Sequence, residues 1–119
     1  MQTINETKEQ NKHSRQELNL SVRVVILSQL SGQIIEEGQA IIRHLKLTGV
    51  VISDLELPNQ ALPLTPFQIA LIIEEEPLKR IHMLCSVRQF FHNGNPGLVL
   101  NIDKIPEKHR ARLWEFIRK

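Results

Sequence analysis

The strongest constraint on the fold is an alternation of apolar and polar residues near the start of the chain. From Leu18 to Ile26 every second residue is aliphatic, and the residues between them are mostly polar. Successive side chains of a β-strand point to opposite faces, so this period of two predicts a strand with one buried face. The pattern favours a β-fold from residue 18 onward.

Five further segments have strand character. Pro58, Pro63 and Pro66 each remove a backbone donor, so the stretch that contains them must be a connection or a sheet edge. Residues 92–97 combine strong turn formers between two strand-like runs, which predicts a hairpin. The expected strands after the first are 40–47, 48–57, 67–73, 80–91 and 98–102.

A helix is predicted at the C-terminal end. Pro106 suits the first turn because its missing N–H would be unpaired there, and Glu107 favours the positive end of the helix. Leu113 and Ile117 form one apolar face, which Trp114 widens. The sequence therefore predicts a mainly β protein, a six-stranded antiparallel β-barrel with a C-terminal α-helix.

Length and composition indicate a single domain. With 119 residues, 41% of them hydrophobic, the chain can bury one core. Residues 1–16 hold few aliphatic side chains, so we expect a flexible N-terminal arm there and the folded domain over 17–119. The single Cys85 cannot form an internal disulfide and is expected in the core. Without a signal peptide or a long apolar run, we expect a cytoplasmic protein with no membrane insertion.

Catalytic and metal motifs are missing from the sequence. It has no phosphate-binding glycine loop, no nucleophile elbow and no paired C-x-x-C, and its five histidines lack ligand spacing. We therefore expect neither an enzyme nor a metal site, and no cofactor.

Charge is unevenly distributed. The net charge is +2, but residues 104–119 hold six basic and two acidic side chains. A basic helix of this kind could bind an acidic partner or a phosphate. Only 4% of residues are aromatic, and all of them lie in segments that need core residues, so nucleic-acid binding is disfavoured. The aromatic residues expected in the core are Phe67, Phe90, Phe91, Trp114 and Phe116.

Three segments look like parts of one known domain. Residues 14–24 look like its junction between arm and first strand, 49–54 like the strand leading into its second ligand motif, and 97–102 with the following helix like its closing elements. From residue 12 to residue 119 the chain resembles the PilZ domain, a small bacterial barrel. The resemblance implies that fold and a role in sensing the dinucleotide cyclic di-GMP.

The first ligand motif of that family is R-x-x-x-R in the arm. Arginine forks bond phosphate oxygens and guanine edges in pairs and stack on base planes. By resemblance the second arginine falls on Arg15, whereas the first falls on Asn11, which has no guanidinium. Arg23 could replace it, but the alternation of its strand puts this side chain opposite the apolar face.

The second motif is D/N-x-S-x-x-G after a strand. By resemblance Asp54 matches, Glu56 replaces the serine and Asn59 replaces the glycine. Glu56 adds negative charge where phosphate would approach, and a like-charge pair at about 4 Å and an effective dielectric constant of about 20 costs about 4 kcal/mol. Asn59 tolerates a positive φ, so the turn itself survives the change.

These substitutions determine the function that we expect. The chain is interpreted as a PilZ-domain signalling protein of the bacterial cyclic di-GMP network, a non-catalytic adaptor with weak or absent ligand binding. Its partner would be a protein of a motility, type IV pilus or exopolysaccharide pathway. One alternative is a functional cyclic di-GMP receptor that uses Arg15 in a rearranged site, and another is a barrel that binds single-stranded nucleic acid. An exposed barrel edge could equally pair with a second copy.

Overall fold

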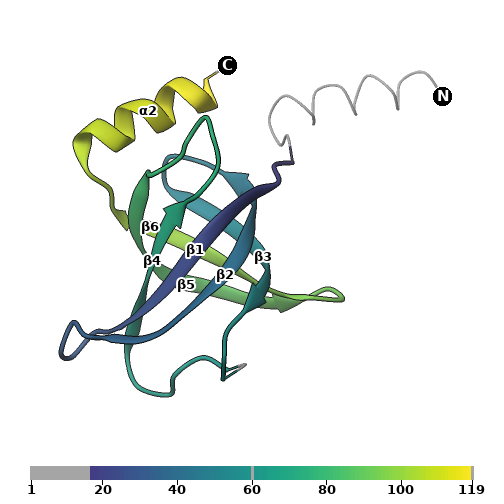
Figure 1. Cartoon of the computed structure of the whole chain (residues 1–119), viewed down its shortest axis with the longest axis vertical. Helices are drawn as coiled ribbons and strands as arrows, with labels where there is room; N and C mark the ends of the chain where they lie inside the picture. Colours follow the sequence, from purple (N-terminus) through teal and green to yellow (C-terminus); the bar gives the residue numbers. More distant parts are fainter. Residues whose placement is uncertain (1–16, 60, 119) are drawn as a thin grey trace.

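Six antiparallel strands close into a barrel in the computed structural model, which describes residues 17–59 and 61–118 (Figure 1). Around the barrel the strand order is β1-β2-β3-β6-β5-β4. The predicted fold class is confirmed. The expected arm, residues 1–16, lies outside the described residues. The elements are β1 Leu20–Ser28, β2 Ile34–Leu45, β3 Gly49–Glu56, β4 Phe67–Ile73, β5 His82–His92, β6 Pro96–Lys104 and α2 Glu107–Ile117.

The core follows from the alternation in β1. Val22, Val24 and Ile26 have no exposed surface, and the register places each of them between a residue of β2 and a residue of β4. Val24, for example, lies opposite Gly38 on one side and Leu71 on the other. Directly opposite residues share a face, so the inward positions of all six strands form one hydrophobic cluster.

The second strand begins six residues earlier than predicted. Ile34 and Ile35 are exposed, and the inward position opposite Ile26 is held by Glu36. A buried carboxylate breaks the apolar alternation by which a strand is recognised. Its Oε2 accepts a hydrogen bond of 2.6 Å from the backbone N–H of Asn59, so the buried carboxyl group has a partner.

A glycine allows β2 and β3 to approach each other at this end. A Cβ at Gly38 would overlap the carbonyl oxygen of Glu56 and lie 2.8 Å from Cδ2 of Leu57. The backbone of β3 occupies the space that any other residue would need, so this position requires glycine.

We predict that Gly38→Ala lowers the free energy of unfolding by about 3 kcal/mol, because the added methyl group must displace backbone rather than a flexible side chain. Urea denaturation followed by circular dichroism measures the change. Gln39→Ala, at the exposed neighbouring position, is the control and should stay within about 0.5 kcal/mol of the parent chain. Equal effects of the two substitutions would contradict the prediction.

The helix closes one end of the barrel (Figure 1). Leu113 is fully buried in the core, and Arg112 donates hydrogen bonds to the carbonyls of Pro77 and Lys79 at 2.8 and 3.1 Å. Trp114 is 47% exposed, so the prediction that it widens the buried face was wrong. His109, one turn before Leu113, occupies that place instead.

His109 is held in a neutral form by its surroundings. It is buried, its Nδ1 accepts a hydrogen bond of 3.3 Å from the backbone N–H of His82, and the two rings meet edge to face at 4.6 Å. An acceptor nitrogen carries no proton. Desolvation lowers the pKa of His109 below its ordinary value of 6.5, and the positive charges of Lys108 and Arg112 act in the same direction.

We predict that His109 makes stability pH-dependent. Between its lowered pKa and 6.5 the unfolded chain binds more protons than the folded one. The free energy of unfolding therefore falls as the pH is lowered through this interval and recovers above it. Urea denaturation at a series of pH values should show this slope in the parent chain and a shallower one in His109→Leu. Identical slopes in the two proteins would contradict the prediction.

The other end of the barrel is less completely covered. β5 pairs with β4 only from His82 to Cys85, whereas it pairs with β6 as far as His92. Beyond Cys85, β5 therefore has no paired strand on its β4 side within the described strands. Phe90, predicted to be a core residue, is 55% exposed for this reason.

Candidate functional site

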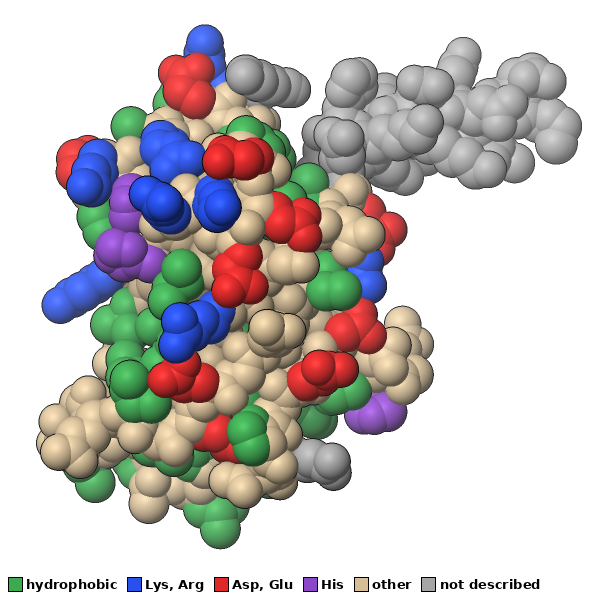
Figure 2. All heavy atoms as spheres, in the orientation of Figure 1, with side chains coloured by type: hydrophobic (Ala, Val, Ile, Leu, Met, Phe, Trp, Pro, Cys, Tyr) green, Lys and Arg blue, Asp and Glu red, His purple; other side chains and the backbone are tan. Residues whose placement is uncertain are grey.

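Basic side chains are most frequent at the helix end of the molecule. Lys and Arg gather around α2 with acidic side chains among them, and Asp and Glu are spread over the same face (Figure 2). No helix in residues 17–59 and 61–118 is long and apolar enough to span a membrane. The basic character of the C-terminal segment is thus concentrated on one exposed element.

A cavity of about 380 Å³ lies on the outer face where the described chain begins. We call it the Arg43 cavity. A bulge in β2 between Ile42 and His44 leaves Arg43 and His44 both on the outer face, where strict alternation would turn one of them inward. Sequence reasoning missed Arg43, because a bulge leaves no mark in the pattern. The lining residues are Glu17, Arg43, His44, Val51, Ser53, Asp54, Phe91, Asn93 and Asn95.

Asp54 is already engaged inside this cavity. Its Oδ2 lies 2.9 Å from Nη2 of Arg43 and 3.1 Å from Oγ of Ser53, and Nε of Arg43 donates a further bond of 2.8 Å to that Oγ. Asp54 has a φ of 54°, a conformation that aspartate tolerates better than most residues. The carboxylate predicted to accept from guanine is thus held by an internal ion pair.

Glu56 lies apart from the Arg43 cavity. It is exposed and lines a neighbouring cavity of about 310 Å³ together with Asp54 and Glu74. Three carboxylates face this space, and none of its described lining residues is lysine or arginine. Such a cavity repels a phosphate.

Asn59 borders none of the three cavities described here, and its backbone N–H binds Glu36. Within the described chain, the non-glycine residues with positive φ are Asp54 and Arg80, so Asn59 does not use the conformation for which it was singled out. The three positions matched to the second motif therefore do not converge on one cavity.

Arg23 is engaged on another part of the barrel wall. Its guanidinium forms a salt bridge with Glu37 across the β1–β2 pair, with Nε at 3.0 Å from Oε1. The hydrogen bond to Glu37, and then the charge of the same carboxylate, raise the pKa of Arg23. It lines none of these cavities, so it does not replace the missing arginine at Asn11.

Asn11 and Arg15 lie outside the described residues. The described chain begins with Glu17 on the rim of the Arg43 cavity, and the backbone N–H of Leu18 donates to the carbonyl of Arg43 at 2.7 Å. The described chain therefore begins beside Asp54, and the position of Arg15 stays a prediction.

A second stretch has the spacing of the second motif. The resemblance puts that motif after a strand, whereas Asp54 and Glu56 lie inside β3. At the end of β2, His44 lies within the strand and Lys46 directly follows it. They stand five and three residues before Gly49, which is the spacing of the motif's acid and serine from its glycine. The spacing to Gly49 is the sequence signal that could have identified this stretch. Neither His44 nor Lys46 supplies the acid or the hydroxyl.

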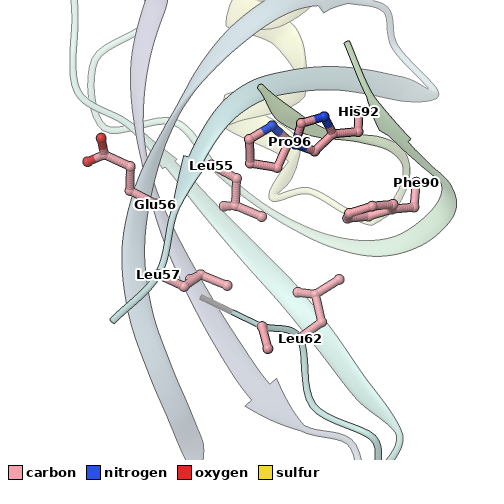
Figure 3. Close-up of a pocket in the computed structure, with 8 residues that line it drawn as sticks. Leu55, Glu56, Leu57, Leu62, Phe90, His92 and Pro96 are labelled. Atoms are coloured by element: carbon pink, nitrogen blue, oxygen red, sulfur yellow. The ribbon is translucent and has the colours of Figure 1, made fainter. Parts of the chain in front are cut away.

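The largest of the three cavities described here, about 770 Å³, is mainly apolar and lies at the open end of the barrel. We call it the Phe90 cavity. Leu55, Leu62 and Phe90 lie around one space, and the carboxylate of Glu56 points away from it (Figure 3). The lining residues are Leu55, Glu56, Leu57, Ala61, Leu62, Phe90, His92 and Pro96.

Cys85 is the one strong nucleophile type in the chain, and it is buried in the core. Desolvation, and then the negative charge of Asp103, raise the pKa of its thiol to about 12. Since the thiolate is the reactive form, this side chain is inert in the folded protein. Among residues 17–59 and 61–118, no group of three or more potential ligands could hold a metal ion.

We predict that iodoacetamide at about pH 8 alkylates Cys85 at least about a hundredfold more slowly in the folded chain than in concentrated urea. Mass spectrometry of timed samples measures both rates. Comparable rates would contradict the burial of this thiol and reopen a nucleophilic role.

Comparison with known proteins gave no relative: no family model matches the chain, and no curated protein matches it. Inferences about function therefore rest on the sequence resemblance, on the barrel and on the chemistry of its cavities.

Proposed function

We propose that this protein is a non-catalytic adaptor of the bacterial cyclic di-GMP network, a PilZ-like barrel with weak or absent binding of the dinucleotide. In this proposal it works in the cytoplasm and binds a partner protein of a motility, type IV pilus or exopolysaccharide pathway. No cofactor takes part.

The observation that carries the proposal is the dispersal of the second ligand motif. Asp54 forms an ion pair with Arg43 and accepts a hydrogen bond from Ser53, Glu56 faces a cavity with two further carboxylates, and Asn59 borders no cavity among those described. A dinucleotide with two phosphates would have to break the internal ion pair and approach unpaired negative charge. Both steps oppose binding.

The fold supports the family resemblance at the level of architecture. A closed six-stranded antiparallel barrel with a C-terminal helix is the fold that the resemblance implies. Barrels of this size carry many unrelated functions, so the cavities rather than the barrel carry the argument about the ligand.

One observation favours the alternative of a functional receptor. The Arg43 cavity combines a guanidinium, the amides of Asn93 and Asn95, and the ring of Phe91 at the point where the N-terminal segment enters the fold. These groups can bond phosphate and guanine edges and stack on a base. In a receptor, Arg43 would replace the first arginine of the R-x-x-x-R motif, which is Asn11 in this chain, and would bind the ligand together with Arg15.

Calorimetric titration of the full chain with cyclic di-GMP tests the proposal. We predict a dissociation constant weaker than about 100 μM for the parent chain, because Arg43 is engaged by Asp54 and Asn11 has no guanidinium. Arg15→Ala and Arg43→Ala should then change nothing measurable.

Tight binding that depends on the two arginines would contradict the proposal. A dissociation constant tighter than about 10 μM that is lost in both arginine variants but kept in Arg110→Ala, an exposed control on α2, would establish the receptor instead. Two double variants locate the lost contacts. Binding gained by Glu56→Ser with Asn59→Gly would show that the motif begins at Asp54. Binding gained by His44→Asp with Lys46→Ser would show that it ends at Gly49.

A further inference from the structure

An open strand edge borders the Phe90 cavity. β5 continues for seven residues beyond Cys85, the last position that pairs with β4, and only its β6 side is paired over that length. Backbone groups along the other edge face no strand in the described part of the chain. Val87 and Phe90, both on this segment, are 36% and 55% exposed. An edge with exposed apolar side chains is a site for pairing with another strand.

The two apolar side chains share the inner face of the sheet. Val87 lies opposite Leu100 and Phe90 lies opposite Leu98, and both leucines are buried in the core. Directly opposite residues share a face, so Val87 and Phe90 point inward at the end where the barrel wall stops. Val87 and Phe90 therefore face inward like core residues but stay exposed, because β4 does not pair with β5 at this end.

A β-bulge is responsible for this arrangement. Between Val87 and Gln89 the register shifts by one residue, so Arg88 and Gln89 together face Val99 on the outer face. Without the bulge, residues three apart would lie on opposite faces of the strand.

The bulge also makes the strand symmetric. From the midpoint between Arg88 and Gln89, the side chains on the inner and outer faces of the sheet follow in the same order toward both ends of the strand. The inner positions are Cys85, Val87, Phe90 and His92, and the outer positions are Ser86, Arg88, Gln89 and Phe91.

We propose that the open edge of β5 pairs with the same edge of a second copy of this chain, antiparallel, about a two-fold axis between Arg88 and Gln89. In this register Val87 of each copy lies opposite Phe90 of the other, on the inner face of a sheet that continues across both barrels. Arg88 lies opposite Gln89, so no like charges are directly opposed. The dimer covers the two exposed apolar side chains of each copy.

Registers shifted by one residue do not match inner positions with inner positions. A shift by one residue in either direction would put Arg88 opposite Arg88, or Gln89 opposite Gln89, and would oppose inner positions to outer ones. A two-fold axis requires the contact surface to be complementary to itself, and this segment meets that condition in the register centred between Arg88 and Gln89.

Sedimentation equilibrium of the full chain, from about 1 μM to about 1 mM, tests the dimer. We expect a reversible monomer–dimer equilibrium, and we expect Phe90→Lys to raise its dissociation constant at least about tenfold by placing a charge against Val87 of the partner copy. Phe90 is more than half exposed, so the variant should fold. Leu30→Lys is the matched control, since Leu30 is 79% exposed on the β1–β2 hairpin, and it should leave the dissociation constant within about twofold.

Cysteine cross-linking tests the register independently. Val87→Cys mixed with Phe90→Cys should form a disulfide-linked heterodimer under mild oxidation, because the Cα atoms of directly opposite residues lie about 4.5–5.5 Å apart, within the range that a disulfide spans. Gln89→Cys alone should cross-link poorly, and the parent chain, with buried Cys85, serves as the blank. A monomer over the whole concentration range would overturn the proposal. So would a dimer that tolerates Phe90→Lys, or one that cross-links most readily through Gln89→Cys.

Discussion

Closure of the barrel depends on the pairing of β1 with both β2 and β4. Each inward residue of β1 has a partner on either side. On the β4 side, Val22, Val24 and Ile26 lie opposite aliphatic side chains, and on the β2 side they lie opposite Ala40, Gly38 and Glu36. Complete burial of such a side chain contributes about 1.5–3 kcal/mol, more than a single exposed contact on the surface does. The positions of the other strands follow from this pairing, and so does the contrast between the two ends of the barrel.

That contrast connects the fold with its possible functions. At one end, α2 supplies Leu113 and His109, and the core is sealed. At the other, β4 and β5 separate, and Phe90 stays exposed above an apolar cavity. The Arg43 cavity lies on the outer wall and is polar. The Arg43 cavity and the open edge of β5 lie on different parts of the barrel, but both include Phe91.

The strands and the helix could be predicted because their patterns are local. Where the prediction was wrong, a tertiary contact overrode the pattern. Glu36 interrupts the alternation of β2, yet it is accommodated by a backbone N–H from a segment 23 residues away. Trp114 looked like a core residue, and His109 took that place because it meets His82. Of the candidate site, Asp54 was found from the sequence, whereas its partner Arg43 was not, because a bulge determines the face on which Arg43 lies.

The sequence by itself determined the number of strands, their antiparallel character, the C-terminal helix and the burial of Cys85, since each depends on periodicity or on residues close together in the chain. Only the tertiary structure decided that Asp54 is engaged by Arg43 and that Phe90 lies at an open edge. Both depend on where strands shift register or stop pairing. Such shifts are set by contacts between distant segments, and no local pattern of residues records them.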